Sequence, residues 1–242
     1  MPDPRHGVFE TLLVIDGHPI ELDAHLARLE ASLDELFPRQ SHPVLEVPSM
    51  STGVLRIAVA PGTDGQLAAT TECRPTNGHF APDNGGQSST RAVSLRSLRL
   101  AGGLGPHKWV DRALLDEAQA TLPEGTLPLL VDERGSVLEA SRANVFSLRD
   151  SVLLTPPLDG RILPGVTRMR AIELAGELGI EAREERLPLN DLLGADEVFL
   201  TGSVRGIEPV GAIDGTSLAG GGNIASELGA ELRRTWVRAK VG

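Results

Sequence analysis

Apolar positions at regular spacings predict one helix and several strands in the first hundred residues. The run GVFETLLVI (7–15) predicts a strand, and Asp16-Gly17 is typical of a hairpin turn into a short second strand. Leucines recur at spacings of four and three from Leu22 to Leu36, which predicts an amphipathic helix that ends before Pro38. Further strands are predicted at 54–62, 66–74 and 92–100, and a polar loop at 75–91.

A second series of elements follows the glycine-rich stretch AGGLGP. Residues 110–122 predict a helix whose apolar face carries Val110, Leu114, Ala118 and Leu122. Residues 126–156 predict a strand meander with turns at Arg134-Gly135 and Arg149-Asp150. A helix that stops at Gly179, an apolar strand, a glycine-rich break and a closing helix are predicted at 165–180, 197–204, 219–223 and 226–239.

The order of these elements predicts an α+β protein with two domains. The first would comprise residues 1–100 and the second residues 107–242, with residues 101–106 as the linker. The second domain would be richer in sheet, because the whole meander lies within it.

Composition narrows the class of protein. The 242 residues carry a net charge of −10, which argues against a nucleic-acid partner because no basic excess is available to replace counterions. The single cysteine, Cys73, excludes an internal disulfide and a cysteine-rich metal site, and no metal is predicted. No apolar run approaches membrane-spanning length, and the start of the chain lacks a signal-peptide pattern. We therefore expect a cytoplasmic protein without a membrane partner.

One lysine is conspicuous by its position. The basic residues are 21 arginines and only two lysines, of which Lys240 lies near the C-terminus and Lys108 in the middle of the chain. Lysine can lose its proton and become a nucleophilic amine, which arginine cannot. The ordinary alternative is a surface lysine, so other residues have to decide between the two.

Three further features indicate a ligand site, each with an ordinary alternative. LPGVTR (163–168) places a tight turn at a helix start, where free amides can bind an anion, although every helix has such a start. TGSVRG (201–206) ends a strand with hydroxyls and glycines that suit a phosphate or form a plain polar turn. Glu139 interrupts an apolar strand, where it is either exposed or buried with a partner.

Taken together, five segments in this order resemble the class IV aminotransferase family, and within it the aminodeoxychorismate lyases. The segments are HLARL, HKWVDR, LEASRANVF, LPGVTR and TGSVRG, and the resemblance extends from Phe9 to Pro209. It implies a two-domain fold of type IV, as in D-amino acid aminotransferase, with pyridoxal 5'-phosphate (PLP) between the domains. It also implies a homodimer that acts on a small-molecule substrate.

The resemblance also implies roles for individual residues. Lys108 would hold the cofactor as a Schiff base and then transfer protons, and Glu139 would keep the pyridine nitrogen protonated. The phosphate would be bound by Arg28, the amides of Val166 and Thr167, and the hydroxyl of Ser203. Asn144 and Arg142 would shape the strand behind the ring, and His25 would be structural support.

Two reactions fit such a cofactor. One is elimination of pyruvate from 4-amino-4-deoxychorismate to give 4-aminobenzoate, and the other is amino-group transfer from branched-chain or D-amino acids. Thr11 stands where the lyases carry threonine and could protonate the leaving enolpyruvate, whereas Leu13 and Ala113 replace residues typical of the transaminases. The chain also contains no tyrosine. We therefore predict a lyase, with an aminotransferase or an inactive cofactor-binding relative as alternatives.

The substrate carboxylates need a cationic partner. Arg205, together with the amides of Val204 and Arg205 in the same turn, is the candidate from the sequence, because an arginine can bind a carboxylate through two hydrogen bonds.

Overall fold

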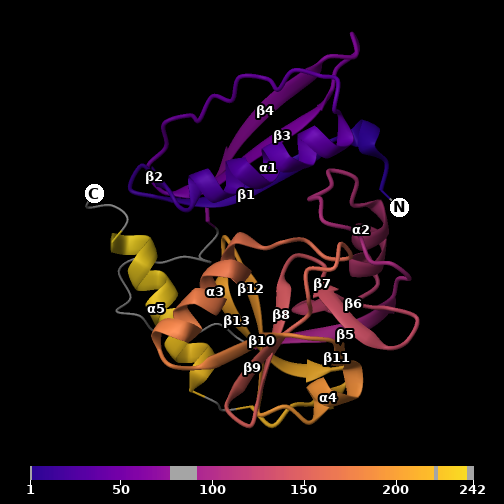
Figure 1. The fold of residues 1–242 in the computed structure, drawn as a ribbon, viewed down its shortest axis with the longest axis vertical. Coiled ribbons are helices and arrows are strands. Elements are labelled where there is room, and N and C mark those ends of the chain that lie inside the picture. Colours follow the sequence, from indigo (N-terminus) through magenta and orange to yellow (C-terminus); the bar gives the residue numbers. More distant parts are fainter. Residues whose placement is uncertain (1, 77–91, 221–222, 239–242) are drawn as a thin grey trace.

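The computed structural model describes residues 2–76, 92–220 and 223–238, which form two sheets of different size (Figure 1). The smaller sheet has four strands in the order β2-β1-β3-β4, and every neighbouring pair is antiparallel. A short 3-10 helix at Pro4–His6 precedes it. Its strands are β1 (Val8–Ile15), β2 (His18–Pro19), β3 (Gly53–Pro61) and β4 (Leu67–Arg74).

The predicted leucine stripe covers one face of the smaller sheet. Helix α1 (Leu22–Leu36) has the predicted bounds and buries Leu29 and Leu33 against Leu12 and Leu55 of the sheet. Each such leucine contributes roughly 1.5–3 kcal/mol on burial, so this face fixes α1 against β1 and β3. The other face of β1 carries Phe9 and Thr11 toward the rest of the molecule.

The larger sheet contains ten strands. Their order is β10-β9-β8-β12-β13-β5-β6-β7-β11, with β14 paired to β13. The predicted meander is present as β6 to β9, whereas β10, β11, β13 and β14 were not predicted. The bounds are β5 (Val93–Arg99), β6 (Thr126–Val131), β7 (Ser136–Ala140), β8 (Asn144–Arg149), β9 (Val152–Thr155), β10 (Glu181–Glu184), β11 (Leu187–Pro188), β12 (Glu197–Gly202), β13 (Gly206–Ile213) and β14 (Thr216–Ser217).

Helices cover the larger sheet on both sides. Helices α3 (Val166–Glu177) and α5 (Ile224–Arg238) pack on one face around Phe146 and Phe199, and α4 (Leu189–Leu193) lies against the other. Leu13 and Ile15 of β1 enter the same core as Phe199, so the two sheets share packed side chains. Within the part of the chain that the structure describes, no helix combines the length and the apolar composition needed to cross a bilayer.

Strand β5 lies in a different sheet from the one expected. It pairs in parallel with β6 and with β13, near the middle of the larger sheet. The sequence places this strand in the first domain because it precedes the glycine-rich stretch, and pairing across that stretch cannot be read from spacing. A domain boundary at the predicted linker, residues 101–106, would therefore separate β5 from the sheet in which it pairs.

The predicted apolar face of the next helix is wrong. Helix α2 (Ala113–Ala120) begins three residues later than predicted and buries Leu115, whereas Leu114 is 46% exposed. The reason is that the preceding residues are extended, since the amide of Val110 donates to the carbonyl of Gly7 at 3.1 Å. Most of the loop at 75–91, part of the break at 219–223 and Lys240 lie outside the described residues.

Candidate active site

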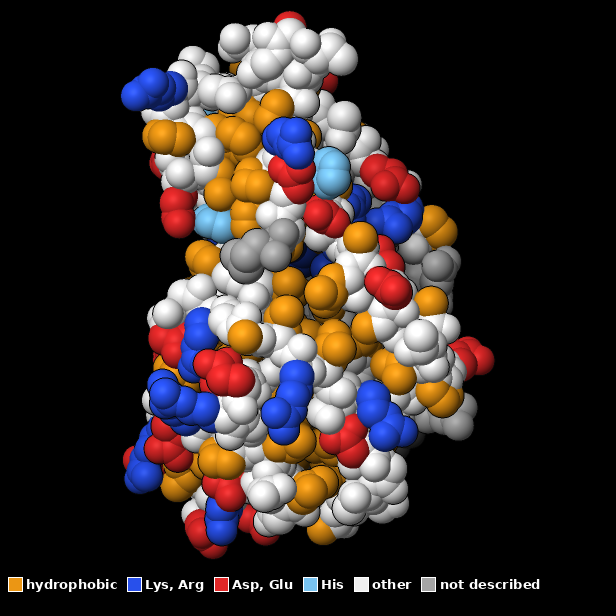
Figure 2. Space-filling view, turned by 90° about the vertical axis from the view of Figure 1, so that its right-hand side faces the viewer, with side chains coloured by type: hydrophobic (Ala, Val, Ile, Leu, Met, Phe, Trp, Pro, Cys, Tyr) orange, Lys and Arg blue, Asp and Glu red, His pale blue; other side chains and the backbone are white. Residues whose placement is uncertain are grey.

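A cavity of about 660 Å³ lies between the smaller sheet and the larger one. In Figure 2 the molecule is hollowed between its upper and lower parts, and basic side chains are visible inside the hollow. A cavity of this size can hold a cofactor together with a small substrate. All ten site residues predicted from the sequence line this cavity: Lys108, Thr11, Glu139, Arg28, Val166, Thr167, Ser203, Asn144, Val204 and Arg205.

Lys108 is held in this cavity by a short stretch of sheet. The amide of Phe9 donates to the carbonyl of Lys108 at 2.8 Å, and the indole of Trp109 donates to the carbonyl of Leu104 at 2.7 Å. Gly7, whose carbonyl accepts from the amide of Val110, packs closely on β3: it adopts a φ of 80°, and a Cβ there would lie 2.1 Å from the carbonyl oxygen of Val59. The Lys108 Nζ lies 5.2 Å from the centre of the Phe9 ring.

Burial makes the Lys108 amine easier to deprotonate. It lowers the pKa of Lys108 from 10.5 to about 8, although the nearby charge of Glu10 opposes this shift. The neutral form is therefore substantially populated near neutral pH, as a nucleophile requires.

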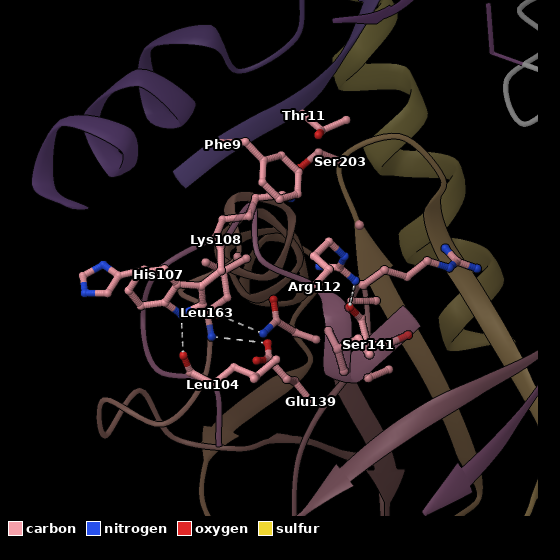
Figure 3. A pocket seen from close by; sticks show the side chains of 18 of the residues that line it. Phe9, Thr11, Leu104, His107, Lys108, Arg112, Glu139, Ser141, Leu163 and Ser203 are labelled. Atoms are coloured by element: carbon pink, nitrogen blue, oxygen red, sulfur yellow. Dashed lines mark hydrogen bonds between the residues drawn. The ribbon is translucent and has the colours of Figure 1, made fainter. Parts of the chain in front are cut away.

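Glu139 is a buried acid that lines the same cavity (Figure 3). Its carboxylate accepts a hydrogen bond from the amide of Leu163 at 3.2 Å. Burial raises the pKa of Glu139 to about 8, and the amide hydrogen bond and the charge of Lys108 only partly oppose the shift. Among the described residues no cation forms an ion pair with it, so a positively charged group in the cavity would stabilise its ionised form.

The N-terminus of α3 also lines the cavity and can bind an anion there. Gly165 is the N-cap and supplies no side-chain cap, so the amides of Val166 and Thr167 lack a helical partner. The Thr167 hydroxyl lies 3.2 Å from that of Ser203, which brings two of the predicted segments together. The side-chain amide of Asn144 donates to the carbonyl of Leu163 at 2.9 Å, so it holds the turn that precedes the helix.

Arg28 reaches the N-terminus of α3 from α1. It donates to the carbonyl of Pro164 at 2.7 Å and to both carboxylate oxygens of Glu10, each at 2.7 Å. Three of its five N–H groups are thus engaged, and two are left for a ligand.

A buried carboxylate below the cavity orients Arg28. Glu10 is 1% exposed and also accepts from Nδ1 of His25 at 2.7 Å. Burial alone would raise the pKa of Glu10, but the His25 hydrogen bond and the Arg28 charge lower it to about 2. Burial lowers the pKa of His25, which favours its neutral form, and its ring lies against Glu10; the structural role of His25 stays a prediction.

Several arginines of the cavity were missed from the sequence. Arg56 lies over the ring of Phe9 at 3.6 Å, and β1 pairs with β3 so that it stands directly opposite Thr11. Arg112 precedes α2 and lines the cavity close to Glu139. Arg205, the sequence candidate for the substrate carboxylates, instead shares Glu208 with Arg142, at 3.2 and 2.7 Å. Arg56 could have been found from the sequence, because it is an arginine within the apolar run VLRIAVA.

Comparison with known proteins identifies the family. The profile of "Amino-transferase class IV" matches residues 7–213. The chain belongs to the class IV aminotransferase family. The predicted family, the fold of type IV and the membership of a family of enzymes are thereby confirmed.

The relatives of this chain within the class IV aminotransferase family differ in activity. A Methanocaldococcus jannaschii protein provisionally named a branched-chain-amino-acid aminotransferase is 33% identical, over 86% of this chain and 79% of its own. The aminodeoxychorismate lyase of Bacillus subtilis is 30% identical, over 86% of this chain and 78% of its own. A hypothetical aminotransferase from Mycobacterium tuberculosis, solved in a PLP-bound form, is 24% identical with a TM-score of 0.75, covering 92% and 87% of the two chains.

The residues present fit the cofactor of the class IV aminotransferases. PLP is that cofactor, and it has an aldehyde, a ring nitrogen that can carry a proton and a phosphate. The cavity offers an amine of lowered pKa, a buried acid that lacks a cationic partner among the described residues, and a helix start with an arginine beside it. Each chemical group of the cofactor thus has a counterpart among the residues that line the cavity.

Proposed function

We propose that the chain is a PLP-dependent 4-amino-4-deoxychorismate lyase, which releases pyruvate and leaves 4-aminobenzoate. The position of Thr11 carries this proposal. Its side chain lines the cavity that contains Lys108, and its cross-strand neighbour is the cation Arg56. A hydroxyl beside a cation suits a leaving group that is both an enolate and a carboxylate. The similarity to the Bacillus subtilis lyase supports the same activity.

In this proposal each of the predicted cavity residues has a separate role. Lys108 holds the cofactor and, once free, removes the proton from the amine-bearing carbon. When bound, PLP supplies a ring that accepts the resulting electron pair. Glu139 holds the proton on the ring nitrogen, and Arg28, Val166, Thr167 and Ser203 hold the phosphate, with Asn144 supporting their turn.

The elimination then needs no second substrate. The carbon–oxygen bond to enolpyruvate would break, and the Thr11 hydroxyl would relay the proton that Lys108 removed to the departing group, which becomes pyruvate. The ring that remains becomes aromatic, so the step is effectively irreversible. Arg56 is a candidate for holding one carboxylate. Arg205 with the amides of its turn stays the candidate from the sequence, although its side chain is already paired with Glu208. The homodimer and the cytoplasmic location stay predictions.

The second candidate is an aminotransferase, which the 33% identical archaeal relative favours. An assay of the purified protein with PLP separates the two. A lyase forms pyruvate and 4-aminobenzoate in equal amounts from 4-amino-4-deoxychorismate without any oxo acid. Conversion of valine or D-alanine that depends on 2-oxoglutarate, without lyase activity, would establish the aminotransferase instead. Absence of both activities would leave the inactive relative.

Replacing Glu10 by glutamine should weaken PLP binding by roughly 10- to 100-fold. Hydrogen bonds between charged groups are worth about 1.5–3 kcal/mol each, and the amide keeps at most part of those that orient Arg28. The measurement is the PLP dissociation constant of the refolded, cofactor-free protein, with folding checked by circular dichroism. Glu30→Gln, at an exposed glutamate on α1 two residues after Arg28, is the matched control. Equal affinity in both variants would show that Glu10 does not position Arg28.

The rate at which cofactor-free protein captures PLP should rise with pH, reach half its maximum at about pH 8 and then level off. Only the neutral amine attacks an aldehyde, and with a pKa of about 8 roughly one Lys108 in ten is neutral at pH 7. An ordinary lysine would be neutral in fewer than about one case in a thousand at that pH. Stopped-flow absorbance gives the profile, and a midpoint near that of free lysine would contradict the assignment. Glu10→Gln should move the midpoint to lower pH, because the Glu10 charge raises the pKa of Lys108.

A further inference from the structure

Arg112 is a cavity cation that forms no direct contact with a carboxylate of the described residues. Its Nη2 donates to the carbonyl of Ser141 at 2.6 Å (Figure 3), and no ion pair within the described part of the chain includes it. Asp116 and Glu139 are close enough to influence its pKa, yet burial outweighs both and lowers it. One of its five N–H groups is used in that hydrogen bond, so enough donors are left for a carboxylate.

Most other arginines of the cavity differ in this respect. Arg28 is held by Glu10, and Arg142 and Arg205 are both held by Glu208. Arg74 lies 3.5 Å from Glu72 at the surface. These side chains therefore already have an acidic partner within the protein.

Arg56 resembles Arg112 and faces the cavity from the smaller sheet. It stacks on Phe9 and has no ion pair among the residues that the structure describes. Burial lowers the pKa of Arg56 and of Lys108, and the nearby cations add to both shifts: Arg74 and Arg112 act on Arg56, and Arg28, Arg112 and Arg56 act on Lys108. Two cations from different walls thus repel each other and Lys108 across one cavity, and a ligand with two negative groups would relieve that repulsion.

We propose that Arg112 binds one carboxylate of a dicarboxylate substrate and that Arg56 faces the other. The inference rests on the proposed function, because it assigns a carboxylate of the substrate to a residue beside the lyase machinery. The phosphate of the cofactor has its own site at the start of α3, so it does not compete for Arg112. Selection for two carboxylates would separate this chain from relatives that accept amino acids with one.

The test uses two inert aromatic acids that differ by one carboxylate, 3-(carboxymethoxy)benzoate and 3-methoxybenzoate. Their dissociation constants are measured by calorimetry on the PLP-bound protein, for wild type, Arg112→Gln and Arg112→Lys. Arg134→Gln, at an exposed turn, is the control. The glutamine variant should bind the dicarboxylate roughly 10- to 100-fold more weakly and the monocarboxylate less than about threefold more weakly. The lysine variant should lie between glutamine and wild type, because it keeps the charge without the planar fork.

Three results would overturn the inference. They are unchanged binding of the dicarboxylate by Arg112→Gln, equal weakening of both acids, and an altered visible spectrum or affinity of PLP, which would place Arg112 against the cofactor. Neither acid is turned over, so the outcome is independent of the lyase assay. Weaker binding of the dicarboxylate alone, in a protein without lyase activity, would refute the proposed function but support the carboxylate site at Arg112. Lyase activity with no difference between the two acids would support the function and refute the site.

Discussion

Lys108→Ala should lower turnover by at least about 10⁴-fold and remove the visible absorbance of bound PLP. Proton transfer by a positioned side chain typically contributes about 10²–10⁴-fold, and the variant also loses the covalent attachment of the cofactor. The structure places this amine inside the cavity, where burial lowers its pKa to about 8. The measurements are kcat with saturating PLP and the absorption spectrum after removal of free cofactor.

The other lysine of the chain provides the control. Lys240→Ala should behave as wild type in both measurements, whereas Lys108→Arg should fail like the alanine variant because arginine keeps its proton. Turnover of Lys108→Ala at more than about a hundredth of the wild-type rate would show that another group removes the proton.

Glu139→Gln should lower kcat by about 10²–10⁴-fold while PLP stays bound. A neutral amide occupies the same space but cannot keep a proton on the ring nitrogen, so the ring accepts electrons less readily. The variant should therefore show a nearly unchanged dissociation constant for PLP and a reduced rate of the chemical step. Glu133→Gln, an exposed glutamate of the preceding turn, is the control. A kcat within threefold of wild type would contradict the role of the acid.

The same variant tests the pKa of Glu139 without the reaction. In cofactor-free protein the folded-state pKa of about 8 lies above the ordinary glutamate pKa of 4.5, so the folded state binds the proton more tightly than the unfolded state. The contribution of this group to the free energy of unfolding is therefore complete below pH 4.5 and is lost as the pH rises through 8. Glu139→Gln should flatten that part of the stability profile, measured by denaturant unfolding.

The spacing of apolar residues predicted an element correctly where that spacing alone defines which face is buried. The leucine stripe from Leu22 to Leu36 specified α1 because its spacing alone defines a buried face. Helix α2 shows the limit of that reasoning, since its apolar residues fit two faces and the sheet pairing of Val110 decides where the helix begins.

The site was predicted where the chemistry lies in a motif and missed where it depends on pairing. Lys108, Glu139 and the start of α3 carry their own signals. Arg56 becomes a site residue only because β3 pairs with β1 in a register that sets it opposite Thr11. Glu10 could have been found, because an acid inside the run GVFETLLVI raises the same question of a buried partner as Glu139 does.

The position of β5 has a consequence for dividing the protein. A C-terminal fragment that starts after the glycine-rich stretch would lack this strand, so β6 and β13 would each present a row of unpaired backbone groups. Such open edges invite pairing with other chains, and the fragment should aggregate when it is expressed alone. Strand β5, which precedes the glycine-rich stretch, is thus an integral part of the larger sheet. The chain therefore passes between the smaller and the larger sheet at more than one place, and a cut at one linker cannot separate them.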